Sequence, residues 1–426
     1  MKENIILTKK GKSANGTIQL TGSKSECNRA LIIAALSDSR VKVENISDAA
    51  DTQTLTAVLK SEVGSQKSED SGLKTQDLRL VNVGPAGTAM RFLTAYLTLQ
   101  NSDIVLTGSE RMKQRPIGIL VDALREIGAS IEYLEKIGYP PLRINGGFEQ
   151  QKDAISIKGD VSSQYITALL LIASQLPKGL TLQIEGELTS RPYVEMTLAM
   201  LQQAGIQHQW NGNNIHIAKQ SFKETTVYVE PDWSAASYWY AIAALADEAE
   251  LFLPGLTAYS LQGDSVITEI MANFGITSQF KEGGVYLKKE AKPLQRKIFD
   301  LKSCPDLAQT VIVVCAALGH DATFTGLETL KIKETDRVKA LQNELAKIGV
   351  KLIEKGQVYK LDCSEKHIPQ KAFINTYDDH RMAMAFAPLA LIIPEVEIED
   401  YMVVEKSYPA FWEDLKKVGF EVKGER

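Results

Sequence analysis

Hydrophobic and polar positions follow the same order six times along this chain. Each time, a short apolar strand leads through a loop of small or polar residues into an apolar helix. The six segments are TIQLTGSKSECNRALIIAAL, LRLVNVGPAGTAMRFLTAYL, AISIKGDVSSQYITALLLIA, TVYVEPDWSAASYWYAIAAL, IFDLKSCPDLAQTVIVVCAAL and AFINTYDDHRMAMAFAPLAL. Their spacing of roughly 60–75 residues is longer than that of solenoid repeats and predicts six larger α/β units.

A second pattern falls between these segments. A helical stretch ends in glycine and a strand follows, at LKSEVGS, LREIGASIEY, LQQAGIQHQW, MANFGITSQF, LAKIGVKLIE and LKKVGFEV. Glycine just past a helix is the usual left-handed cap. Alternating stretches such as ASIEYLEKIGYPPLRING then predict hairpins. Each unit is predicted to run strand–helix–strand–helix–strand–strand.

The repeats predict an α/β fold (α+β repeats) with two lobes of three units each. A chain of 426 residues is too long for one simple core, which also favours two domains. The alternative is the ordinary alternation of any α/β protein, but both patterns recur in register all six times. At each strand-to-helix junction, unpaired N–H groups offer a site for anions. Helices pointing inward would bring six such ends to one cleft.

Composition narrows the class of protein. Net charge is −5 and basic residues are scattered, which argues against binding to nucleic acid or an anionic membrane. The longest nearly apolar run, 382–394, is too short to span a bilayer, and the N-terminus lacks a signal-peptide pattern. Four separated cysteines predict free thiols in a reducing compartment. The five histidines have no metal-ligand spacing, so no metal is expected. We expect a cytoplasmic monomer.

Several junction loops carry cations and hydroxyls. TGSKSECNR places Lys24 and Ser25 in a loop and Arg29 about one turn into a helix. GPAGTAMR offers Gly87 and a capping Thr88, and RMKQRP offers Arg115 before a helix-starting proline. Each of these motifs is also compatible with a solvated helix cap or an ordinary charged surface.

Two further segments carry polar groups at predicted helix starts. VSSQYITALL offers Ser162, Ser163 and Gln164, and TSRPY offers Ser190 and Tyr193. For each serine taken singly, a plain N-cap is the default interpretation.

KIKETDR is the densest constellation, with Lys333, Glu334 and Arg337 in five residues. On a helix, Lys333 and Arg337 would share a face, with Glu334 beside Arg337. The equivalent junctions add Asp306, Arg381 and Lys406. So many cations at helix starts in an acidic protein would repel one another, so they predict a site for polyanionic ligands.

The chain resembles the EPSP synthases, the 3-phosphoshikimate 1-carboxyvinyltransferases of the enolpyruvyl transferase family. The resemblance covers essentially the whole chain. It rests on GSKSxxNRAL, AGTAMR, LTGxxRMKxRPI, SSQxxTALL, SxPY, SLQGD, KETDR and DHRMAM, all in order. It implies a two-lobed inside-out α/β barrel of βαβαββ units, with residues 1–22 plus 225–426 in lobe I, 23–224 in lobe II and the active site in the cleft between them.

The resemblance also implies a reaction. The enolpyruvyl group of phosphoenolpyruvate would pass to the 5-hydroxyl of shikimate 3-phosphate, with release of phosphate, by addition and elimination through a tetrahedral intermediate. No cofactor is implied. By resemblance, shikimate 3-phosphate would contact Lys24, Ser25, Arg29, Ser162, Ser163, Gln164, Ser190, Tyr193, Asp306 and Lys333. Phosphoenolpyruvate would contact Lys24, Gly87, Arg115, Gln164, Arg337, Arg381 and Lys406. Asp306 would be the base on the 5-hydroxyl, and Glu334 and Lys24 the candidates for proton exchange at C3.

Two departures and two alternatives accompany this interpretation. Thr329 stands where an Asn often helps to bind the shikimate, and it can still donate one hydrogen bond with a shorter reach. Pro85 stands where better-known members have Asn, and proline removes both the side-chain amide and the N–H that this loop could offer to phosphoenolpyruvate or to the inhibitor glyphosate. A UDP-N-acetylglucosamine enolpyruvyl transferase would typically carry a cysteine in the loop equivalent to RMKQRP, which this chain lacks. A non-catalytic polyanion-binding protein on the same fold is the alternative of another class, but both Asp306 and Glu334 are present.

Overall fold

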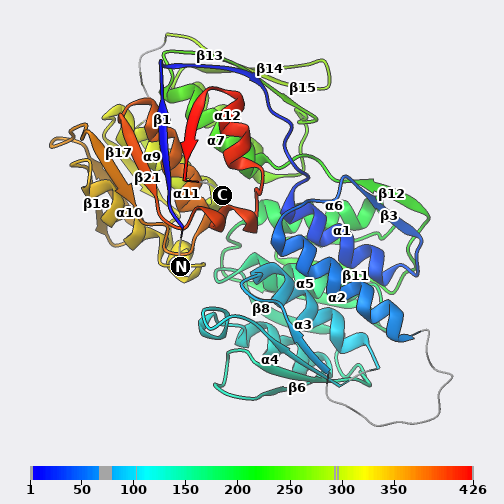
Figure 1. Ribbon diagram of the computed structural model, residues 1–426. Helices are drawn as coiled ribbons and strands as arrows, with labels where there is room; N and C mark the ends of the chain where they lie inside the picture. The colour runs from blue at the N-terminus through cyan, green and yellow to red at the C-terminus, as the bar shows by residue number, and fades with distance from the viewer. Residues whose placement is uncertain (1–2, 67–78, 102, 292–293, 295–296, 425–426) are drawn as a thin grey trace. The chain divides into compact units, whose positions relative to one another are not determined.

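In this computed structural model, strands gather into sheets that repeat one plan. The structure describes residues 3–66, 79–101, 103–291, 294 and 297–424. The chain divides into unit 1, Met1–Ser23 with Glu230–Arg426, and unit 2, Lys24–Val229. Each unit is described by itself below (Figure 1).

Unit 1 contains three four-stranded sheets among its described residues. In each, the first two strands pair in parallel and the other two join antiparallel. Across the first sheet the order is β2 (Ser13–Thr17), β13 (Glu248–Pro254), β15 (Gly284–Lys289) and β14 (Ile276–Lys281). Across the second it is β16 (Ile298–Asp300), β17 (Ala322–Thr325), β19 (Val358–Asp362) and β18 (Lys351–Lys355). Across the third it is β20 (Lys371–Ile374), β21 (Glu395–Ile398), β1 (Ile5–Lys9) and β22 (Phe420–Lys423).

Unit 2 repeats this plan in two sheets and shows its parallel pair in a third. The strands are β4 (Arg79–Asn82), β5 (Ile104–Thr107), β7 (Leu142–Asn145) and β6 (Ser130–Tyr133); β8 (Ala154–Lys158), β9 (Leu180–Glu185), β11 (Asn214–Ile217) and β10 (Gln209–Asn211); and the parallel pair β12 (Thr225–Tyr228) and β3 (Val41–Glu44). The hairpin expected in ASIEYLEKIGYPPLRING is confirmed as β6 and β7.

Helices alternate with the strands along the chain in both units. Unit 2 holds α1 (Lys24–Leu36), α2 (Ala50–Gln66), α3 (Gly87–Tyr96), α4 (Gly118–Ile127), α5 (Ser163–Ala173) and α6 (Arg191–Gln203), and unit 1 holds α7 (Trp233–Leu245), α8 (Ile267–Ala272), α9 (Ala308–Leu318), α10 (Arg337–Ala346), α11 (His380–Phe386) and α12 (Phe411–Lys417). Nearly every residue of α5, α7 and α9 is buried, as expected of helices that are apolar on all sides. In unit 1, α9 packs against both α7 and α11.

Two strands lie in different units from the helices that they precede in sequence. We expected TVYV to be the first strand of the unit that contains α7, but this segment is β12, which pairs with β3 after α1. Conversely β2, which precedes α1, pairs in parallel with β13 after α7. This pairing keeps β12 in unit 2, so the chain returns to unit 1 at Glu230 rather than at the expected residue 225.

Helix ends follow the glycine pattern with one exception. Gly128, Gly205, Gly275, Gly349 and Gly419 all have positive φ, the conformation in which glycine carries no Cβ penalty. Gly64 does not end its helix, because α2 continues to Gln66. The proline of RMKQRP is also not the first helical residue, since α4 begins at Gly118.

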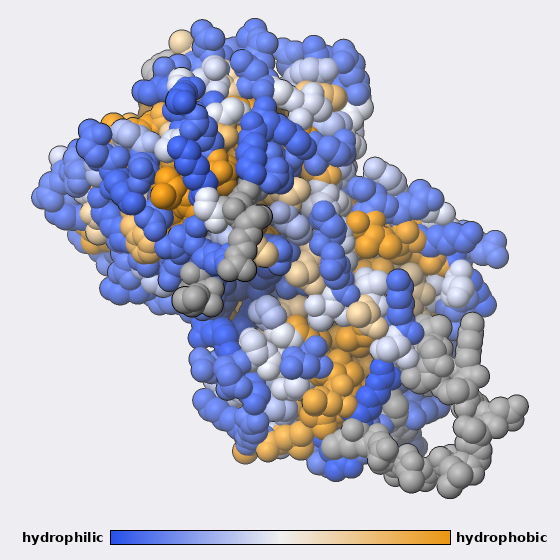
Figure 2. Space-filling model, viewed as in Figure 1, coloured by the Kyte–Doolittle hydropathy of each residue, from blue (hydrophilic) through white to orange (hydrophobic). Residues whose placement is uncertain are grey.

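Polar side chains cover most of the face of each unit seen in Figure 2, with smaller hydrophobic areas between them. Larger apolar side chains are gathered inside, including Trp233, Trp239 and Phe386, all fully buried. Among the described residues, no helix is both long enough and apolar enough to cross a membrane.

Candidate active site

In unit 2, the start of α1 places a lysine beside an aspartate. The helix begins at Lys24 itself, so Lys24 and Ser25 belong to its first turn rather than to a loop as expected. The Lys24 Nζ lies 3.2 Å from Asp51 Oδ2, and both side chains are largely buried. The ammonium is therefore held at a helix start, where backbone N–H groups already favour an anion.

Arg29 lies one turn further along, with an exposed fraction of only 2%. Its guanidinium donates to Thr197 Oγ1 (2.8 Å) and to the backbone oxygens of Ser25 (2.6 Å) and Tyr193 (3.3 Å). The rings of Tyr193 and Phe92 also lie against it. Burial lowers the pKa of Arg29 to about 10, partly opposed by Tyr193 and Glu26. A buried cation held mainly by neutral oxygens would gain from an anionic ligand.

Arg115 packs directly against the first residue of α3. It is the buried cation of RMKQRP, whereas Lys113 makes half-exposed ion pairs with glutamates on the surface. A Cβ on Gly87 would lie 2.6 Å from Arg115 Nη1, so only glycine leaves room for the guanidinium at this helix start. Buried Arg91 supports the same loop by donating to Pro116 O (2.9 Å). The turn at Pro85 closes through Ala86 N–H, which donates to Val83 O (3.1 Å).

The serines at the starts of α5 and α6 differ in role. Ser162 is the N-cap of α5, since its Oγ accepts from Gln164 N–H (3.3 Å). Ser163 follows as a buried residue in the first turn, and the Gln164 amide donates to Thr88 Oγ1 (3.2 Å). Ser190 is not such a cap: its side chain makes no capping bond, and its φ of 53° is left-handed. A strained non-glycine residue is often found at functional sites.

In unit 1, Arg337 gathers three carboxylates. It is the first residue of α10 and is 1% exposed. It donates to Asp379 Oδ2 (2.6 Å), Glu334 Oε2 (2.9 Å) and Asp306 Oδ1 (3.4 Å). Burial alone would lower the pKa of Arg337, but Asp379, Glu334 and Asp306 together raise it. The guanidinium is therefore permanently charged and fixes the positions of two predicted catalytic acids.

Asp306 is held from its other side by Arg381. The Asp306 Oδ2 accepts from Arg381 Nη2 (2.9 Å). Arg381 is the second residue of α11, and its backbone N–H is capped by the Asp379 side chain. Burial would raise the pKa of Asp306, but Arg381, Lys333 and Arg337 outweigh it and hold that pKa well below its usual range. In the unliganded protein Asp306 is therefore an ionised carboxylate and a weak base.

Glu334 lies between two cations that are predicted to bind phosphoenolpyruvate, Lys406 and Arg337. Its Oε1 lies 3.1 Å from Lys406 Nζ, and its Oε2 accepts from Arg337. The expectation that Lys333 and Arg337 share a helical face is wrong, because Lys333 follows a 3-10 turn and Asp336 caps α10 by accepting from Lys339 N–H. A four-residue spacing is a helical contact only inside a helix.

Four residues around this cluster were missed by sequence reasoning. Asp379 holds Arg337, and Tyr238 and Ser234 accept from Arg381 at 3.3 and 3.4 Å. Asp264 is buried and accepts from Ser234. Asp379 and Asp264 stand in the DHRMAM and SLQGD strings, which were a usable signal. The described residues hold no group of three or more His, Cys, Asp or Glu side chains fit for a metal ion.

The family model described as EPSP synthase (3-phosphoshikimate 1-carboxyvinyltransferase) matches residues 8–415. The chain belongs to the EPSP synthase family. A 3-phosphoshikimate 1-carboxyvinyltransferase from Bacteroides fragilis is 46% identical over 410 residues, with 96% of each chain covered. One from Pectobacterium carotovorum is 38% identical over 423 residues, covering 96% of this chain and 97% of the relative. The EPSP synthase motifs named above thus stand in a chain that aligns with these relatives almost end to end.

Solved structures support the mixed α/β fold of this EPSP synthase family member. An EPSP synthase from Acinetobacter baumannii matches with a TM-score of 0.77 at 21% identity, covering 99% of this chain and 100% of that one. The enolpyruvyl transferase NikO from Streptomyces tendae matches with a TM-score of 0.73 at 17% identity, covering 99% of each. At these identities the likeness concerns the fold alone.

Proposed function

We propose that this protein transfers the enolpyruvyl group of phosphoenolpyruvate to the 5-hydroxyl of shikimate 3-phosphate, releasing phosphate, in the route to chorismate and the aromatic amino acids. The observation that carries this proposal is the match of the EPSP synthase model to residues 8–415, joined to the carboxylate Asp306 held between Arg337 and Arg381. We further propose that each unit is a lobe of three βαβαββ repeats in an inside-out barrel, and that the chain acts as a cytoplasmic monomer.

The two polar clusters divide the work in this proposal. Shikimate 3-phosphate is bound by Lys24, Ser25, Arg29, Ser162, Ser163, Gln164, Ser190 and Tyr193 of unit 2, together with Asp306 and Lys333 of unit 1. Phosphoenolpyruvate is bound by Lys24, Gly87, Arg115 and Gln164 of unit 2 and by Arg337, Arg381 and Lys406 of unit 1. Cations that lie near carboxylates in the unliganded state can exchange these for phosphate and carboxylate oxygens of the substrates.

The proposed reaction needs a base and an acid. Asp306 takes the proton of the 5-hydroxyl as that oxygen attacks C2 of the enol, and Glu334 and Lys24 are the groups proposed to exchange the proton at C3. Contact with the hydroxyl and exclusion of water would offset the depressed pKa of Asp306. The tetrahedral adduct then loses phosphate and a C3 proton, which restores the C2–C3 double bond and leaves the enolpyruvyl group joined to the 5-oxygen as an enol ether.

Phosphate release is the direct test. Purified protein is mixed with phosphoenolpyruvate and either shikimate 3-phosphate or UDP-N-acetylglucosamine. Release with shikimate 3-phosphate alone is expected. Release with the sugar nucleotide instead would overturn the acceptor, and folded protein that releases phosphate with neither would overturn the enzyme activity.

Gly87→Ala is predicted to raise the KM for phosphoenolpyruvate by about tenfold, the equivalent of one lost charge-assisted contact. The added methyl must displace Arg115 Nη1, which lies 2.6 Å from its position. The KM for shikimate 3-phosphate, measured in the same assays, is the internal control and should change less than about twofold. An equal rise in both constants would mean that the substitution disturbs the whole unit instead.

A further inference from the structure

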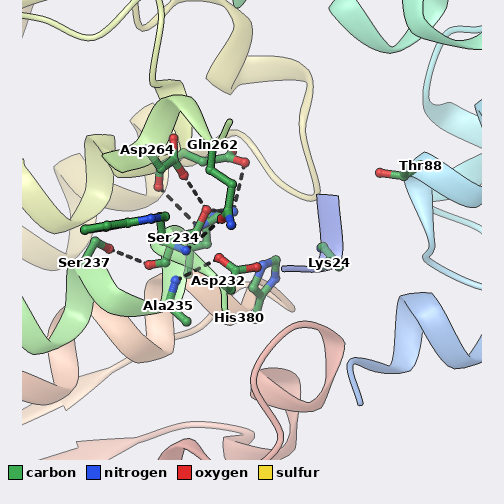
Figure 3. A network of polar contacts seen from close by, with 12 residues as sticks. Lys24, Thr88, Asp232, Ser234, Ala235, Ser237, Gln262, Asp264 and His380 are labelled. Atoms are coloured by element: carbon green, nitrogen blue, oxygen red, sulfur yellow. Dashed lines mark hydrogen bonds and ion pairs between the residues drawn. The ribbon is translucent and has the colours of Figure 1, made fainter. Parts of the chain in front are cut away.

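A polar chain inside unit 1 links the proposed base to a second buried aspartate. Arg381 Nη2 donates both to Asp306 Oδ2 (2.9 Å) and to Ser234 Oγ (3.4 Å). Ser234 Oγ in turn donates to Asp264 Oδ2. Ser234 lies in the first turn of α7, and Asp264 lies in the 3-10 turn Gly263–Val266; Figure 3 shows the two side chains close together. Arg381 therefore stands between two acids.

The second oxygen of Asp264 has no hydrogen-bond partner. Asp264 is 3% exposed, and its Oδ1 is buried without a donor. A buried, unpaired carboxylate oxygen is costly when charged, so this environment favours the neutral acid. Burial, followed by the charge of Asp306, raises the pKa of Asp264 to about 7, against the opposing effects of Arg381 and Ser234; Asp232 adds a smaller rise.

The two acids are thus separated in protonation. Arg381, Lys333 and Arg337 keep Asp306 ionised, whereas burial raises the pKa of Asp264 and favours its neutral form. Two carboxylates around one guanidinium titrate as a pair, in which the state of one alters the other. When Asp264 is neutral, the positive charge of Arg381 attracts Asp306 and a substrate anion without competition from a second carboxylate. An ionised Asp264 would compete for it through Ser234.

We propose that Asp264 is a positioning residue that, through Ser234, sets how firmly Arg381 is held against Asp306 and how much of its charge is available to phosphoenolpyruvate. This inference rests on the proposed function, because Arg381 and Asp306 are the proposed substrate-binding and base groups. Asp264 itself acts only through Ser234 and Arg381. The consequence is a dependence of phosphoenolpyruvate binding on pH that belongs to the protein rather than to the substrate.

The test compares the KM for phosphoenolpyruvate of wild type and Asp264→Asn, from about two pH units below to two above the pKa of Asp264. In wild type the KM should rise with pH about three- to tenfold more than in the variant, which cannot ionise. The titration of phosphoenolpyruvate itself is common to both and cancels in their ratio. Identical pH profiles would overturn the proposal.

Ser234→Ala provides the second arm. It removes the hydroxyl that joins Arg381 to Asp264 and should lower kcat/KM by about tenfold. Ser237→Ala is the matched control, because Ser237 lies on the same helix, and its hydroxyl contacts Thr310 Oγ1 (3.1 Å) and the backbone oxygen of Ser234 (2.7 Å) rather than Arg381 or Asp264. The control should stay within about twofold of wild type. Equal effects of the two substitutions would also overturn the proposal.

A titration without substrates separates this proposal from the proposed reaction. With ¹³C-carboxyl-labelled aspartate, the resonance that is missing from Asp264→Asn should titrate near neutral pH in wild type and shift in Ser234→Ala. A resonance that titrates in the ordinary aspartate range, or that ignores Ser234→Ala, would refute the role of Asp264. Protein that shows the expected titration but no turnover would instead refute the proposed function.

Discussion

Asp306→Asn is expected to lower kcat by about 10²- to 10⁴-fold, the usual contribution of a positioned general base. The amide fills the same space but cannot accept the 5-hydroxyl proton. Because it carries no charge, it also releases Arg381 and Arg337, which both donate to Asp306 in the native protein. The KM for phosphoenolpyruvate should therefore stay constant or fall while kcat collapses. Steady-state kinetics with both substrates varied would measure the separate effects on kcat and on KM.

Asp300→Asn is the control for that experiment. Asp300 ends β16 in the same unit and pairs with Thr325 at an exposed position, so its substitution should leave kcat within about twofold. A kcat for Asp306→Asn within about threefold of wild type would contradict the assignment and move the base to another group. A collapse of kcat together with a large rise in both KM values would indicate misfolding of the cluster instead.

Arg337→Met is expected to destabilise unit 1 by about 3–5 kcal/mol, the range for removing one partner of a buried ion pair. The substitution leaves Asp379, Glu334 and Asp306 without the guanidinium that holds all three. Arg337→Lys should recover only part of this loss, since an ammonium cannot reproduce the fork geometry. Denaturant unfolding followed by tryptophan fluorescence is suitable, because Trp233, Trp239 and Trp412 belong to unit 1 and only Trp210 to unit 2.

The pH dependence of this loss provides an independent check. The pKa of Asp306 is lowered in the folded protein, so its stabilising contribution is complete above the unfolded value of roughly 3.9 and is lost as pH falls towards the folded value. The stability difference between wild type and Arg337→Met should therefore shrink as pH drops below about 4. Arg191→Met, which removes a half-exposed pair with Glu195, should cost less than about 1 kcal/mol. A loss for Arg337→Met of that same size, independent of pH, would contradict the central role of this arginine.

Local pattern was sufficient for much of this protein. Helices that are apolar on every side, such as α9, could be predicted because no solvated face interrupts them. Glycines such as Gly128 end helices because only they adopt the left-handed cap without strain. The charged groups of the site could be named because acids and bases gathered at helix starts have few structural uses, and the strings that carry them resemble one family. These features depend on residues a few positions apart.

Tertiary structure decided the pairings between distant residues. Nothing in the residues of β2 or β12 specifies a partner, so the pairing of each with a strand some 180 or more residues away, β2 with β13 and β12 with β3, follows from the packing of whole units. Arg337 meets Asp379 42 residues away, and Ser234 meets Asp264 30 residues away. The start of α10 was likewise not evident from the KIKETDR pattern. Asp336 is the N-cap of α10, so Lys333 lies outside the helix. Sequence therefore determined which chemical groups this protein has, and long-range packing, whose energy depends on many residues at once, determined which of them meet.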